Sequence, residues 1–174
     1  ISDGIVSAYR IVNDHKELLT QTRTDQLGQF HLDIQSESLN QLILLELSTD
    51  PNTRMRCDLT TGCIDQNSGE LVNFGEDITL PSFFKLFGIA GNPVTSNNSA
   101  FISPLTHLVV ATAKNIDSAL TSESINVASE WVKSALKLES SPLQVQLKDI
   151  TQLEHLPIMT DEELKQSIIA AAMY

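Results

Sequence analysis

A helix start in the middle of the chain most constrains how this sequence can fold. Ser103 is a good N-cap, because its hydroxyl can accept a hydrogen bond from an unpaired N–H of the first turn. Pro104 suits the first helical position, where its missing N–H removes no hydrogen bond. One face then repeats every three or four residues: Leu105, Leu108, Val109, Thr112, Ile116, Ala119 and Leu120. The spacing predicts a helix from Pro104 to about Leu120, packed on one side.

His107 falls near the apolar edge of this predicted helix. A ligand role would need several convergent groups around it. The sequence shows none, so we expect a partly buried histidine with one hydrogen bond.

The first 50 residues predict an antiparallel sheet. Period-two alternation favours strands at Ile5–Val12, 18–24 and 30–35, and the apolar run LILLEL at 42–47 favours the most buried strand. Residues 13–16 are a turn by composition. Two further short strands are expected at 77–80 and 83–89.

Glu46 lies inside the apolar run. No partner carboxylate is identifiable for it, so we expect an edge or strand-end residue and not a catalytic acid.

Cys57 and Cys63 are separated by five residues in the turn-like stretch RCDLTTGC. Such a pair can close a small disulfide ring if the Cα atoms come within about 7 Å. A zinc site is disfavoured, because no second cysteine pair or nearby histidine completes four ligands. Two free cysteines of a cytosolic protein are the alternative. A disulfide would place the chain outside the cytoplasm.

The second half of the chain predicts helices. Thr121 or Ser122 caps a helix in which Trp131, the only tryptophan, is expected to pack against the first helix. Residues 139–158 are ambiguous and are interpreted as an extended connection along the helices. Thr160 and Glu163 form a capping box for a last helix that runs to the end of the chain.

Charge and motifs narrow the function. The 174 residues carry 22 acidic and 11 basic side chains, a formal net charge of −11, which argues against nucleic acid and anionic membrane surfaces as partners. No apolar run approaches the about 20 residues that cross a bilayer. Glycine-rich phosphate loops, HExxH, EF-hand and GxSxG motifs are absent. We therefore expect no catalytic residues, no cofactor and no metal.

Two stretches carry a family resemblance. Residues 24–30, TDQLGQF, resemble the TDxxGxF turn of carboxypeptidase regulatory-like, transthyretin-like β-sandwich modules, and residues 3–9, DGIVSAY, are similar to the opening G-x-V-S-G-A-x-V. The family's glycine between Ser7 and Ala8 is missing. Residues 102–108, ISPLTHL, resemble a helix entry found downstream of such modules in bacterial secreted proteins and lipoproteins. The resemblance implies an extracytoplasmic module without active-site residues.

These observations predict an α+β chain in which an N-terminal antiparallel β-sandwich of the prealbumin or immunoglobulin type packs with a C-terminal helical region. The expected boundaries are residues 1–90 for the sandwich, 91–98 for a linker and 99–174 for the helices. The two regions should pack together through residues 83–89 and the first helix. Since the chain opens on Ile1 and ends at Tyr174 within a predicted helix, we expect a piece of a longer protein.

The expected function is a non-enzymatic structural, adhesion or ligand-display module of a secreted or cell-envelope protein. The alternatives are a glycan- or peptide-binding domain and an accessory domain of a larger extracellular hydrolase. The expected partner is an envelope protein or a glycan, with no transmembrane span in this chain and a lipid anchor upstream of Ile1 left open.

Overall fold

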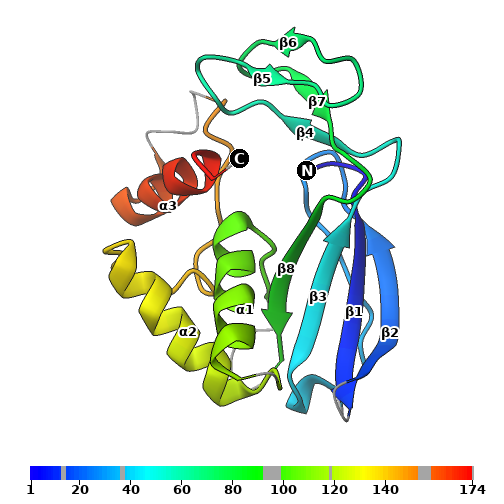
Figure 1. The fold of residues 1–174 in the computed structure, drawn as a ribbon, viewed down its shortest axis with the longest axis vertical. Helices are drawn as coiled ribbons and strands as arrows, with labels where there is room; N and C mark the ends of the chain where they lie inside the picture. Colours follow the sequence, from blue (N-terminus) through cyan, green and yellow to red (C-terminus); the bar gives the residue numbers. More distant parts are fainter. Residues whose placement is uncertain (13–14, 36–37, 92–98, 118, 153–157, 174) are drawn as a thin grey trace.

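A computed structural model describes residues 1–12, 15–35, 38–91, 99–117, 119–152 and 158–173. It contains helices and antiparallel sheets, so the predicted α+β class is confirmed. In Figure 1 the helices lie on one side of a long four-stranded sheet, and two small sheets lie beyond one end of it.

The main sheet has the strand order β2-β1-β3-β8, and every neighbouring pair is antiparallel. Its strands are β1 (Ile5–Val12), β2 (His15–Arg23), β3 (Ile43–Ser48) and β8 (Lys85–Ala90). β2 begins earlier than predicted, because His15 and Lys16 already pair with Val12 and Ile11. The other two residues of the predicted turn lie outside the described residues.

The chain between β3 and β8 forms the two small sheets. β4 (Arg54–Arg56) pairs with β7 (Asp77–Thr79), and β5 (Cys63–Ile64) pairs with β6 (Leu71–Val72). Neither pair belongs to the four-stranded sheet. The β-sandwich therefore stays a prediction.

Three capping boxes begin the three helices α1 (Pro104–Ile116), α2 (Ser122–Ala135) and α3 (Asp161–Ala171). Their N-caps are Ser103, Thr121 and Thr160, as the sequence predicts. α1 ends four residues earlier than its apolar repeat predicts, because Asp117 has extended backbone angles. No helix among the described residues is long and apolar enough to cross a bilayer.

Residues 139–152 contain neither helix nor strand, as the interpretation of an extended connection requires. Leu143 from this stretch is buried against α1 and α2. The last part of the predicted connection, residues 153–157, lies outside the described residues.

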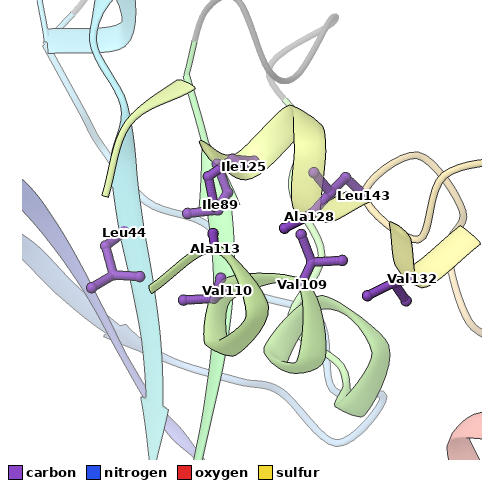
Figure 2. Close-up of a cluster of buried hydrophobic side chains, with 9 residues drawn as sticks. All are labelled: Leu44, Ile89, Val109, Val110, Ala113, Ile125, Ala128, Val132 and Leu143. Carbon is purple, nitrogen blue, oxygen red and sulfur yellow. The ribbon is translucent and has the colours of Figure 1, made fainter. Parts of the chain in front are cut away.

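One apolar core joins the sheet to the helices, as Figure 2 shows. Leu44 of β3 and Ile89 of β8 meet Val109, Val110 and Ala113 of α1 there. Ile125, Ala128 and Val132 of α2 complete it from the far side. The predicted contact between residues 83–89 and the first helix is thus present, although Phe83 itself is 81% exposed.

The opposite face of the sheet is apolar as well. Val6, Ala8, Ile43, Leu45 and Leu47 point to this face. Two segments without regular secondary structure cover it, residues 30–34 and residues 100–102. The two segments line a hollow over this face of the sheet.

Candidate functional site

An open groove of about 1370 Å³ lies over this second face of the sheet. Residues 27–35 form one wall, residues 99–103 form the other, and Leu45 and Ala90 lie at its floor. Gln146 and Leu147 also line it. The groove is built from parts of the chain that are far apart in sequence.

The first wall is placed by the turn at residues 24–29. The Asp25 carboxylate accepts hydrogen bonds from the N–H groups of Leu27 and Gln29 at 2.9 and 2.8 Å. Gly28 takes a φ of 76°, which favours glycine. The predicted turn is therefore present, but the strand predicted at 30–35 is not, because the chain that follows crosses the sheet face without pairing to β2.

The second wall is placed by a close crossing at Gly88. Ile102 forms an isolated antiparallel bridge with Gly88 of β8. A Cβ atom on Gly88 would lie 2.3 Å from the backbone oxygen of Phe101, so only glycine fits there. One step further on, the Thr106 hydroxyl donates to the Phe87 oxygen at 2.8 Å and fixes the start of α1 against β8.

The groove offers hydrogen-bonding and apolar groups with little charge. Asp33 is the only carboxylate among the described residues that line it, and the Nε2 atom of His31, also in the lining, lies 3.1 Å from its Oδ1. The hydroxyl of Ser103 is already engaged, since it accepts a hydrogen bond from the Thr106 N–H. Neutral polar groups among apolar ones are the usual lining of a ligand-binding groove.

A second hollow of about 840 Å³ continues from the groove toward the small sheets. Arg56 lies there between two carboxylates, with its Nε 3.6 Å from Asp77 and its Nη1 3.5 Å from Asp149. Burial raises the pKa of Asp58, whose Oδ1 is buried and has no hydrogen-bond partner among the described residues. The described residues hold no cluster suited to a metal ion here or elsewhere.

Glu46 lies on the other face of the sheet and is not the edge or strand-end residue that we expected. It sits in the middle of β3, an interior strand, where Lys16 from β2 and Lys85 from β8 donate to its two oxygens at 2.7 and 2.6 Å. Burial raises the pKa of Glu46, but the two lysine hydrogen bonds outweigh burial and hold it below the usual range. A carboxylate with a lowered pKa is a weak base, so this ion cluster joins strands and is poorly suited to proton abstraction.

His107 lies beside the same cluster. Its ring stacks on Phe87 with the centroids 5.3 Å apart, and Nδ1 is buried without a hydrogen-bond partner. Lys16 and Lys114 also contact the Phe87 ring, at 5.1 and 4.7 Å from its centroid. Burial, and secondarily Lys114, lowers the pKa of His107. His107 is partly buried as expected, but the structure shows no side-chain hydrogen bond from it to any described residue, and its ring is held by stacking on Phe87 instead.

We expect the Glu46→Gln substitution to lower the free energy of unfolding by about 1–2 kcal/mol at pH 7, because two charge-assisted hydrogen bonds lose their acceptor charge. A lowered native pKa contributes stability above the unfolded-state pKa of about 4.3, and this stability is lost as the pH falls through the native pKa. Urea unfolding at pH 7 and pH 3 should show the two proteins converging in acid. Glu130→Gln, at an exposed pair with Lys133, is the control and should change little. An equal loss at both pH values would contradict the ionic role.

The predicted Cys57–Cys63 disulfide is present, with the Cα atoms 5.7 Å apart. Both cysteines are buried in a small core with Met55, Ile78 and Leu80. Asp65 stabilises the same region, because it accepts hydrogen bonds from the Thr79 N–H at 2.7 Å, the Thr79 hydroxyl at 2.8 Å and the Ser68 N–H at 2.9 Å. These bonds hold the pKa of Asp65 far below its usual range.

We expect replacement of both cysteines by serine to lower the free energy of unfolding by about 2 kcal/mol, the chain-entropy value for so short a ring. Guanidinium unfolding of the oxidised wild type and of the double variant measures this difference. Wild-type protein unfolded in a reductant should match the variant. Equal midpoints for the oxidised wild type and the variant would show that the disulfide ring does not reduce the conformational entropy of the unfolded chain enough to stabilise the fold.

Trp131 does not pack against the first helix as predicted. Its side chain is 61% exposed on α2, whereas its neighbour Val132 is 4% exposed and takes the core position. The structure therefore brings Glu46 and His107 to one cluster, places the cysteines in the small sheets, and leaves Trp131 apart from both. Sequence reasoning missed the groove, although the alternation at 30–35 marked one of its walls.

A scan against protein-family models, a search of curated proteins and a search of solved structures each give no match to this chain. The resemblance to carboxypeptidase regulatory-like modules therefore stays an expectation drawn from residues 3–9, 24–30 and 102–108.

Proposed function

We propose that this chain is a non-enzymatic binding module of a bacterial cell-envelope or secreted protein, and that the groove is its binding surface. The groove carries the proposal. It exceeds the about 300–1,000 Å³ of most small-molecule sites, and its described lining residues offer neutral polar and apolar groups around a single carboxylate.

The disulfide supports an extracytoplasmic location, because disulfides persist in oxidising compartments and are rare in the cytosol. The turn at residues 24–29 and the coverage of the second sheet face by residues 30–34 favour a sandwich-type module of the kind that the sequence resembles. The resemblance to such modules implies a role in adhesion or ligand display.

Mass spectrometry of the native protein tests the location. The envelope, medium and cytosolic fractions of the source cells are alkylated before and after reduction, and the intact masses are compared. We expect the protein outside the cytosol, with alkylation of both cysteines only after reduction. Free thiols on a cytosolic protein would overturn the extracytoplasmic part of the proposal.

A glycan-binding function is a second candidate, favoured by the exposure of Trp131. Val127, one turn earlier on α2, is also 37% exposed, so the two make a small apolar surface. Because Trp131 is the only tryptophan, its fluorescence reports this surface directly. In a glycan screen we expect a saturable emission shift that Val127→Ala weakens; no shift with any glycan would remove this candidate.

A further inference from the structure

One wall of the groove has the side-chain pattern of a β-strand without its hydrogen bonds. Phe30, Leu32 and Ile34 point into the sheet-face core, while the His31 and Asp33 side chains are 87% and 96% exposed. No backbone hydrogen bond joins residues 30–34 to any other described residue. Buried backbone N–H and C=O groups are nearly always hydrogen-bonded, so unpaired ones are expected where a solvent molecule or a ligand can reach them. With respect to the described part of the chain, this wall therefore presents a row of unpaired donors and acceptors.

The side chains hold this wall in place although its backbone is unpaired. Its three inward side chains pack on Ala8, Ile43 and Leu45, and the chain just before it is fixed by the Asp25 turn. An extended segment of five residues is about 17 Å long, the usual length of a short strand. An incoming strand would meet a preformed edge and would not have to order it.

The shape of the groove favours an extended chain as the occupant. It runs along residues 27–35, and its volume is larger than that of most small-molecule sites. Leu45 and Ala90 at the floor suit apolar side chains at every second position of a strand, because successive side chains point to opposite faces.

Charge favours a basic peptide over an acidic one. Asp33 is the only carboxylate among the described residues of the lining, which include no lysine or arginine, and the whole chain carries a net charge of −11. The exposed His31 ring beside Asp33, with Nε2 at 3.1 Å from Oδ1, leaves the second carboxylate oxygen for an incoming cation. A lysine or arginine beside Asp33 would gain attraction, and a carboxylate would be repelled.

We propose that the groove binds an extended segment of a partner protein by strand addition along residues 30–34, with apolar side chains over Leu45 and Ala90 and a lysine or arginine near Asp33. Main-chain hydrogen bonds supply affinity in this mode of recognition, and the alternate side chains supply specificity. The inference rests on the proposed binding function of the groove. It adds the class of partner, an extended basic segment of another protein.

Selection from a displayed library of random nine-residue peptides on the whole oxidised chain is the first step of the test. We expect selected peptides with apolar residues at alternate positions, at least one lysine or arginine, and few acidic residues. Absence of any peptide with a Kd below about 100 μM would overturn the proposal. This outcome would not affect the proposed extracytoplasmic location, because the alkylation experiment tests the location separately.

Amide hydrogen exchange by NMR then locates the pairing. Amides of residues 30–34 should exchange rapidly in the free protein, and alternate ones should slow at least tenfold in the complex. Peptides N-methylated at the odd or at the even positions are matched controls, since only one set of amides faces the wall. One series should lose at least tenfold in affinity and the other much less. Protection elsewhere, or equal loss in both series, would contradict strand addition.

Asp33→Asn should weaken binding of a basic peptide by about two- to fivefold, the range of an exposed ion pair, while Glu123→Gln on α2 should leave it unchanged. Slow exchange at 30–34 in the free protein at every concentration would show that the groove is already filled by the chain itself. Slowing that grows with protein concentration would assign it to a second copy. Either result would overturn the peptide partner.

Discussion

The Leu44→Ala variant is expected to lose about 3 kcal/mol of unfolding free energy and still to unfold in a single transition. Leu44 is 1% exposed, and its side chain lies where β3 meets α1 and α2, so the substitution leaves a cavity in the one core that both layers share. Leucine-to-alanine changes at such positions remove the transfer free energy of the side chain and add the cost of the cavity.

Urea unfolding followed by far-ultraviolet circular dichroism and by Trp131 fluorescence measures both parts of this prediction. The two probes should give the same midpoint, because Trp131 reports on α2 and the core around Leu44 joins α2 and α1 to the sheet. Leu18→Ala, at a position that is 54% exposed on β2, is the control and should change stability by less than about 0.5 kcal/mol. Two separate transitions would show that residues 1–90 and 99–174 are independent domains.

Gly88→Ala is expected to destabilise the protein by about 3 kcal/mol, at the upper end of the usual overpacking range. The added Cβ would lie 2.3 Å from the Phe101 oxygen, a backbone atom that cannot move aside by a rotamer change. The crossing of the chain over β8 would have to shift, and with it the second wall of the groove.

Thermal unfolding compares this variant with Gly69→Ala. Gly69 has a φ of 71°, and a Cβ there would meet nothing within 4 Å, so this control carries only the conformational cost of about 1 kcal/mol. The Gly88 variant should also bind any selected peptide more weakly than its stability explains. Equal losses in the two variants would show that the crossing tolerates displacement.

Local chemistry made much of this fold predictable. β1 begins and ends where the alternation places it, and the three N-caps stand at Ser103, Thr121 and Thr160, because such signals act within a few residues. The sequence does not choose between Trp131 and Val132 for the core position, because both fit a helical repeat and tertiary packing decides between them.

The candidate site depended on long-range geometry. Residues 30–34 alternate as a strand would, and the sequence could show that they are half-buried. It could not show that no strand among the described residues pairs with them. Glu46 looked like a strand end because a charge in an apolar run has no local partner. Lys16 and Lys85 reach it from 30 and 39 residues away, a distance at which no spacing rule applies.

The crossing at Gly88 also bears on how the molecule avoids aggregation. Long, flat, unpaired strand edges invite uncontrolled association with other chains. Ile102 occupies the outer edge of β8 at Gly88, and β2 at the opposite edge carries Lys16, Glu17 and Arg23 beside a register shift in its pairing with β1. Both margins of the main sheet are thereby poor templates for a foreign strand, so an incoming strand would find its better template at residues 30–34, as the proposal requires.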